Sequence, residues 1–166
     1  MYHAIDKTDF MLLNNMEVMK GTIPSASYIN ALTGTSGTVS MYQVANQHQD
    51  KESVFESVRE AEFPEAPSRL GAIYCFVSED DANKANADWW DNTREIVAVE
   101  TREIIAMGVY DSKQLDAHQA DWEEAARRYF SGEHTAEPVL EAVICGRIHI
   151  YDWEKYKGLS SELLNI

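Results

Sequence analysis

Hydrophobic and polar positions alternate along several short runs of the chain, and these runs predict β-strands. Residues 70–77 form a long apolar run, in which alternation places Tyr74 and Phe76 on one face and Cys75 on the other. The strands expected on this basis are residues 2–5, 70–77, 95–101, 104–109, 139–145 and, after Gly146 and Arg147, 148–151.

Helices are predicted where apolar residues recur at helical spacing. In the first, Val54, Phe55 and Val58 share one face, and the helix ends before Pro64. Ser78 is a favourable N-cap for the second, since three acidic residues follow it in the first turn. The expected helices are residues 50–63, 79–90 and 114–130 (stopped near Gly132), with a loop or short helix over 7–21 and a last helical turn over 160–166.

Residues 22–49 are rich in Ser, Thr, Asn and Gly and have little periodicity, which predicts a long loop or a weak hairpin. Such a segment is either a lid or binding segment, or has no fixed structure, and the sequence favours neither.

The order of these elements predicts the fold class. Strands open the chain, fill its middle and close it, without regular strand–helix alternation. This order is typical of an α+β fold with a mixed or antiparallel sheet, and 166 residues are enough for one domain over 1–166 with its own core. The glycine-rich loops of dinucleotide-binding and P-loop proteins are absent from the sequence.

Charge and composition narrow the possible partners. The chain has 14 basic and 28 acidic residues, a net charge of −14, which repels phosphate backbones and disfavours nucleic acid as a partner. The acidity is either a solvated surface or a surface that mimics nucleic acid or meets a basic partner.

Other bulk features lead us to expect a cytoplasmic protein. The sequence has no apolar run long enough for a membrane span and no signal-peptide pattern at its start. Cys75 and Cys145 lie in apolar runs and are expected to be buried free thiols. No metal-binding motif is present, so we expect no metal.

Five residues carry candidate chemistry, with structural alternatives beside the functional ones. Ser68 and Arg69 follow a two-proline turn and either face an anionic ligand or, for Arg69, pair with a carboxylate. His3 in the first strand and Tyr74 in the apolar run are either site residues or ordinary strand residues. Glu141 precedes an apolar run, so it lies at a strand mouth or is held there for use.

Two segments resemble the ADP-ribosyltransferase fold. "AIYCFVSEDDANKAN" is similar to its strand-to-helix element, and "EAVICGRIHI" to its closing element with a glutamate at the head of a strand. More closely, "ESVFESVREAEFPEAPSRLGAIYCFVSEDDA" and "YFSGEHTAEPVLEAVICGRIHI" resemble a bacterial and phage family catalogued as a domain of unknown function. The resemblance implies a mixed or antiparallel split sheet with flanking helices.

The resemblance also implies a site that uses NAD as substrate. Glu141 would stabilise the oxocarbenium-like centre formed when the nicotinamide–ribose bond breaks. His3 would hydrogen-bond a ribose, and Tyr74 would stack on the nicotinamide ring. Arg69 with Ser68 would contact the pyrophosphate.

One position departs from the transferase pattern, because Val139 stands where many members have a second Glu or Gln. This departure leaves the target open, and the charge favours a protein target over nucleic acid. Two alternatives remain on the same fold: a catalytically inactive acidic binding or inhibitor protein, and an NAD hydrolase.

Overall fold

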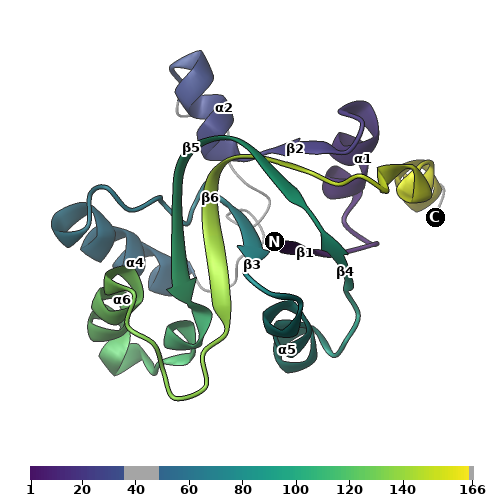
Figure 1. Cartoon of the computed structure of the whole chain (residues 1–166). Helices are drawn as coiled ribbons and strands as arrows, with labels where there is room; N and C mark the ends of the chain where they lie inside the picture. The colour runs from purple at the N-terminus through teal and green to yellow at the C-terminus, as the bar shows by residue number, and fades with distance from the viewer. Residues whose placement is uncertain (36–48, 165–166) are drawn as a thin grey trace.

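A curved antiparallel sheet with helices around it forms the fold in the computed structural model, which describes residues 1–35 and 49–164 (Figure 1). The strands are β1 Tyr2–Ile5, β2 Thr22–Pro24, β3 Ile73–Phe76, β4 Glu95–Ala98, β5 Glu100–Asp111 and β6 Leu140–His149. The α-helices are α1 Phe10–Val18, α2 Ala26–Thr33, α4 Gln49–Glu62, α5 Glu79–Trp90, α6 Trp122–Ser131 and α7 Leu159–Leu164. The short 3₁₀-helices are η1 Ser112–Asp116, η2 Gln119–Asp121 and η3 Trp153–Tyr156. The predicted α+β class is confirmed.

Strand β6 is the centre of the sheet. On one side it pairs with β3 through its first half and with β2 through its second half, and on the other side it pairs with β5. The order β2-β6-β3-β1-β4 completes the sheet, and every described pairing is antiparallel. Side chains pack on both faces of the first half of β6, so Glu141–Ile144 are all buried, whereas buried and partly exposed residues alternate in its second half.

A single residue carries the chain from β4, at one edge of the sheet, to β5, on the far side of β6. Val99 joins β4, which pairs with β1, to β5, which pairs with β6. Its main-chain N–H donates to the Met1 carbonyl at 2.9 Å. The sheet must therefore curl, and β5 is bent further by an irregularity in register between Arg102 and Ala106.

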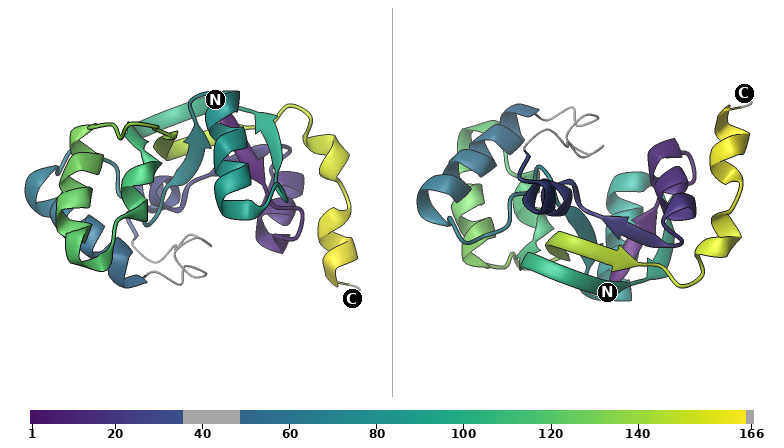
Figure 2. Two further views of the ribbon diagram at one scale, coloured as in Figure 1. Left: turned by 90° about the horizontal axis from the view of Figure 1, so that it is seen from below. Right: turned by 90° about the horizontal axis from the view of Figure 1, so that it is seen from above.

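Side chains pack in clusters on the two faces of the sheet. One face, with Ile5 and Ile144, packs against α1, η3 and α7. The other face, with Val143, packs against α4 and α6, while Phe76 meets α5. Figure 2 shows α4 and α6 at one end of the molecule and α1 and α7 at the other.

Local signals set several helix ends as predicted. Ser78 accepts a hydrogen bond from the Asp81 main chain at the start of α5, and Gly132 with φ of 79° ends α6. Asp9 and Ser25 cap α1 and α2 in the same way. None of the described helices is long and apolar enough to cross a membrane.

Before residue 131, three predicted strands have other bounds and two predicted segments form other elements. The expected strand 70–77 is β3 Ile73–Phe76, and the expected strands 95–101 and 104–109 are β4 Glu95–Ala98 and β5 Glu100–Asp111. Residues 22–33 form β2 and α2 instead of a loop, because β2 pairs with the end of β6. The rest of that predicted loop includes residues 36–48, which lie outside the described residues. Residues 114–130 are not one helix: η1, η2 and then α6 take their place.

Another difference is the glycine predicted to separate two strands. Gly146 and Arg147 stay extended inside β6, because Arg147 pairs with Pro24 on one side and Arg102 on the other. The glycine instead allows a close approach: a Cβ at Gly146 would lie 3.0 Å from the Cα of Ile104.

Both cysteines are free thiols, as predicted, although only Cys75 is buried and Cys145 is partly exposed. Burial raises the pKa of the Cys75 thiol to about 12. This thiol therefore stays protonated and unreactive at neutral pH.

Asp111 ties the loop before β6 to the sheet. It is fully buried and accepts hydrogen bonds from the main chains of Lys113, Thr135 and Val139 and from the Thr135 hydroxyl. Burial alone would raise the pKa of Asp111, but the hydrogen bonds from Thr135, Val139 and Lys113 outweigh it and lower the pKa.

We therefore expect Asp111→Asn to destabilise the protein at pH 7 by about 2 kcal/mol. Since the folded pKa lies below that of an unfolded Asp, the charge stabilises the fold at neutral pH. This contribution is lost as pH falls through the folded pKa, so the difference between variant and wild type should shrink there. Urea unfolding at pH 7 and at acid pH measures this difference in the free energy of unfolding. Asp121→Asn is the control, because the Asp121 side chain is exposed and makes no cap hydrogen bond. An equal effect of both substitutions would contradict the prediction.

Candidate functional site

Arg69 lies at the centre of a buried polar cluster. Its side chain is 3% exposed, and its Nε donates to Glu52 at 3.1 Å. Its Nη1 donates to Glu141 Oε1 and to the Tyr129 hydroxyl, both at 2.5 Å. Tyr129 in turn donates to Glu141 Oε1 at 2.6 Å. We call these four residues together with Tyr74 the Arg69 cluster.

Two aromatic rings enclose the guanidinium. The Arg69 Cζ lies 4.9 Å from the centre of the Tyr74 ring and 5.1 Å from that of Tyr129. The Tyr74 hydroxyl donates back to the Arg69 carbonyl at 2.5 Å. Contacts of this kind favour a weakly hydrated planar cation such as Arg over Lys.

Each member of the cluster comes from a different element. Glu52 is on α4, Tyr129 on α6, Tyr74 on β3 and Glu141 near the start of β6. Arg69 itself follows the buried Pro67 in the turn that leads to β3. The turn thus carries the arginine between helices and sheet, and the cluster joins elements far apart in sequence.

The charges of the cluster are coupled. Burial by itself would lower the pKa of Arg69, but Tyr129, Tyr74, Glu141 and Glu52 raise it. Burial, together with Glu141, raises the pKa of the Tyr129 hydroxyl. Arg69 therefore stays charged and Tyr129 stays a neutral donor over the ordinary pH range. Two carboxylates face one guanidinium in a region with little water.

Ser68 lies beside the Arg69 cluster and not in it. Its hydroxyl donates to Glu56 Oε2 at 3.0 Å, and Arg59 binds the other oxygen of the same carboxylate at 2.8 Å. Glu56 is one helical turn after Glu52 on α4, so Ser68 and Arg69 bind successive turns of this helix.

The His3 imidazole contacts the main chain of Tyr74 and not its side chain. Strands β1 and β3 pair at Tyr2 and Phe76 only, and beyond that point the His3 Nδ1 lies 2.8 Å from the Tyr74 carbonyl oxygen. Tyr2 is opposite Phe76, so alternation places the His3 imidazole on the other face from Tyr74 and Glu141. Burial lowers the pKa of His3. The imidazole thus bridges the place where β1 and β3 part.

Of the sequence-predicted residues, Arg69 contacts the Tyr74 ring and the Glu141 carboxylate. His3 contacts the main-chain carbonyl of Tyr74, and Ser68 binds Glu56 beside the cluster. The alternative that Arg69 pairs with carboxylates is confirmed.

Glu52 and Tyr129 were missed. Helical spacing does predict that both residues are buried, because Glu52 lies three residues before the buried Phe55 and Tyr129 lies on the apolar face of its helix. It does not predict that they bind Arg69.

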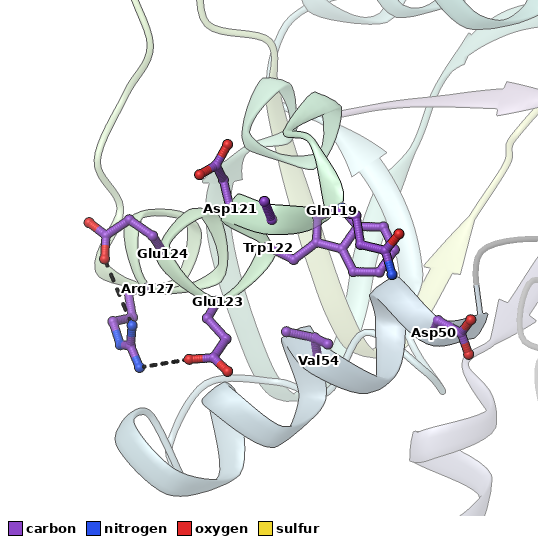
Figure 3. A pocket seen from close by; sticks show the side chains of 9 residues that line it. Asp50, Val54, Gln119, Asp121, Trp122, Glu123, Glu124 and Arg127 are labelled. Carbon is purple, nitrogen blue, oxygen red and sulfur yellow. Dashed lines mark ion pairs between the residues drawn. The ribbon is translucent and has the colours of Figure 1, made fainter.

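A groove of about 620 Å³ lies between α4 and α6 (Figure 3). It is lined by Asp50, Val54, Gln119, Ala120, Asp121, Trp122, Glu123, Glu124 and Arg127. Arg127 forms ion pairs with Glu123 and Glu124 on its own helix. No member of the Arg69 cluster lines this groove. In the described part of the chain, no three His, Cys, Asp or Glu side chains are grouped to hold a metal ion.

Comparison with known families assigns the chain to a family. Its residues 7–157 match the family described as "Protein of unknown function (DUF2441)". The chain belongs to this family. The matched range contains all five members of the Arg69 cluster and leaves out His3. Among curated proteins, no match to the chain was found.

The cluster predicts a large cost for removing Arg69. Arg69→Met should destabilise the protein by about 3–5 kcal/mol, because Glu52 and Glu141 would stay buried without their cation. Denaturant unfolding at pH 7 measures it. Arg127→Met is the matched control: its pairs with Glu62, Glu123 and Glu124 lie at the surface, so it should cost less than about 1 kcal/mol. Similar costs for the two variants would show that the cluster does not hold the fold together.

Proposed function

We propose that this protein is an ADP-ribosyltransferase-like enzyme that binds NAD and transfers ADP-ribose to a protein target. One observation carries the proposal: β1, β3 and β6 are neighbours in the sheet and carry His3, Tyr74 and Glu141, the residues that the resemblance assigns to NAD. Tyr74 and Glu141 share one face of the sheet and the His3 imidazole lies on the other, so NAD would bind at the opening where β1 and β3 part, and His3 would reach it from the opposite face. In this proposal the sheet is of the split ADP-ribosyltransferase type, and the protein acts in the bacterial cytoplasm, encoded by the bacterium or by a phage.

Glu141 is suited to its proposed role by the way it is held. The carboxylate is buried, and Arg69 and Tyr129 both donate to its Oε1. A fixed carboxylate in a dry environment stabilises the positive charge that develops on the ribose when nicotinamide leaves. Arg69 would act as the positioning residue for Glu141. Its predicted contact to the pyrophosphate, with Ser68, stays a prediction.

His3 and Tyr74 would hold the nicotinamide nucleoside from opposite faces of the sheet. The lowered pKa of His3, which burial causes, keeps the imidazole neutral at pH 7. With Nδ1 on the Tyr74 carbonyl, Nε2 would meet a ribose hydroxyl. One face of the Tyr74 ring is against Arg69, and the opposite face would stack on the nicotinamide ring.

The test is incubation of the pure protein with labelled NAD and cell extract. We expect label on a protein, and no label with Glu141→Gln, because the amide cannot stabilise the developing cation. Glu137→Gln is the control, since the Glu137 side chain is 85% exposed near the same strand. Both variants are assayed below their measured melting temperatures, so that loss of fold is not mistaken for loss of chemistry.

Other outcomes of this experiment select other functions. Nicotinamide release without a labelled macromolecule would make the protein an NAD hydrolase. The second candidate is a catalytically inactive acidic binding or inhibitor protein. It would stand if neither label nor nicotinamide release is seen, and if Glu141→Gln keeps whatever effect the wild-type protein has on cells that produce it. The acidic groove between α4 and α6 is the observation that favours this candidate.

A further inference from the structure

Strand β5 exposes an unusual number of large apolar side chains. Ile104, Ile105, Met107 and Val109 are 42%, 54%, 41% and 40% exposed. From Ile105 onward the more exposed residues alternate with less exposed ones, as on one face of a strand. Scattered apolar residues are ordinary on a surface, but a row of them along one strand indicates an interaction site.

The same strand has an open edge. Within residues 1–35 and 49–164, β5 pairs with β6 on one side and with no strand on the other. It is 12 residues long, and its register with β6 is unbroken from Ala106 to Asp111. The irregularity between Arg102 and Ala106 and the charged residues before it protect the first half of this edge, whereas Ala106–Tyr110 has no charged residue, no proline and no break in register.

The charges along β5 are compensated within the chain. Glu100 pairs with Arg102, Glu103 pairs with Arg147, and Asp111 is buried and turned inward. Between Glu103 and Asp111, seven residues in a row are uncharged. In a chain of net charge −14, this strip is a surface on which a second copy meets little repulsion.

The side chains of the strip are also self-complementary. In an antiparallel pair centred on Met107, Ile105 of one copy lies opposite Val109 of the other, on the apolar face. On the opposite face the small residues Ala106 and Gly108 meet. Gly108 has to be small here, because a Cβ would lie 2.1 Å from the Tyr110 hydroxyl of the same chain.

We propose that two copies of this chain associate through their β5 edges, antiparallel and with a twofold axis near Met107, to form a sheet that continues from one copy into the other. Main-chain hydrogen bonds along the two edges give the association, and the apolar row gives its register. The inference is independent of the proposed function, since β5 carries no member of the Arg69 cluster.

The first test is the mass of the full-length protein in solution by sedimentation velocity over a range of concentrations. We expect a dimer for the wild type. Met107→Lys and Ile105→Lys should each weaken association by about tenfold or more, because a lysine in an edge strand blocks pairing. Leu32→Lys, at a 67% exposed apolar position on α2, is the control and should stay dimeric. Circular dichroism shows that each variant is folded.

The second test is the register itself. Met107→Cys should form a disulfide between two copies under mild oxidation, because residues directly opposite on two strands are close enough for one. Leu32→Cys should not. A wild-type monomer at every concentration overturns the proposal, and so does a Met107→Lys protein as dimeric as the wild type. Capture of a different protein through β5 by a monomeric wild type would replace the second copy with another strand-bearing partner.

Discussion

The ion pairs of Arg69 are the interaction on which the rest of this structure depends. A guanidinium that is 3% exposed needs a negative partner, and it has two, one from α4 and one from β6. The same cation lies between the rings of Tyr74 and Tyr129. The cluster therefore fixes the distance between the helix pair and the sheet. A hydrophobic contact of the same area would leave that distance less defined, because it has no preferred direction.

This constraint has consequences for the candidate chemistry. A glutamate that is to stabilise a developing cation must be held without water, and a buried carboxylate is costly unless it is bonded. Arg69 and Tyr129 meet both conditions for Glu141. The stability of the fold and the fixed position of Glu141 in the proposed site would then depend on the same contacts. Substitutions in the Arg69 cluster are thus expected to affect both, which is why the proposed assay compares variants below their melting temperatures.

The central position of β6 has a second consequence. β3 and β2 occupy one side of β6 and β5 covers the other side, and within residues 1–35 and 49–164 no strand pairs with the outer edge of β5. The single-residue connection at Val99 joins β5 to β4 and sets the curl of the sheet. The proposed NAD site and the proposed dimer edge therefore lie on opposite sides of the same strand, and each can be changed without the other.

The elements with strong local signals can be predicted from the sequence. Apolar periodicity and a capping serine defined α4 and α5, since these signals act within one turn. Arg69, Tyr74 and Glu141 were also identified from the sequence as candidate site residues. That Gly146 lies inside a continuous strand depends on tertiary contacts, because β2 and β5 pair with the next residue, Arg147, from both sides. Likewise, only the packing of α4 and α6 brought Glu52 and Tyr129 to Arg69. Their partners lie 17 and 60 positions away in the chain, a separation over which local patterns carry no information.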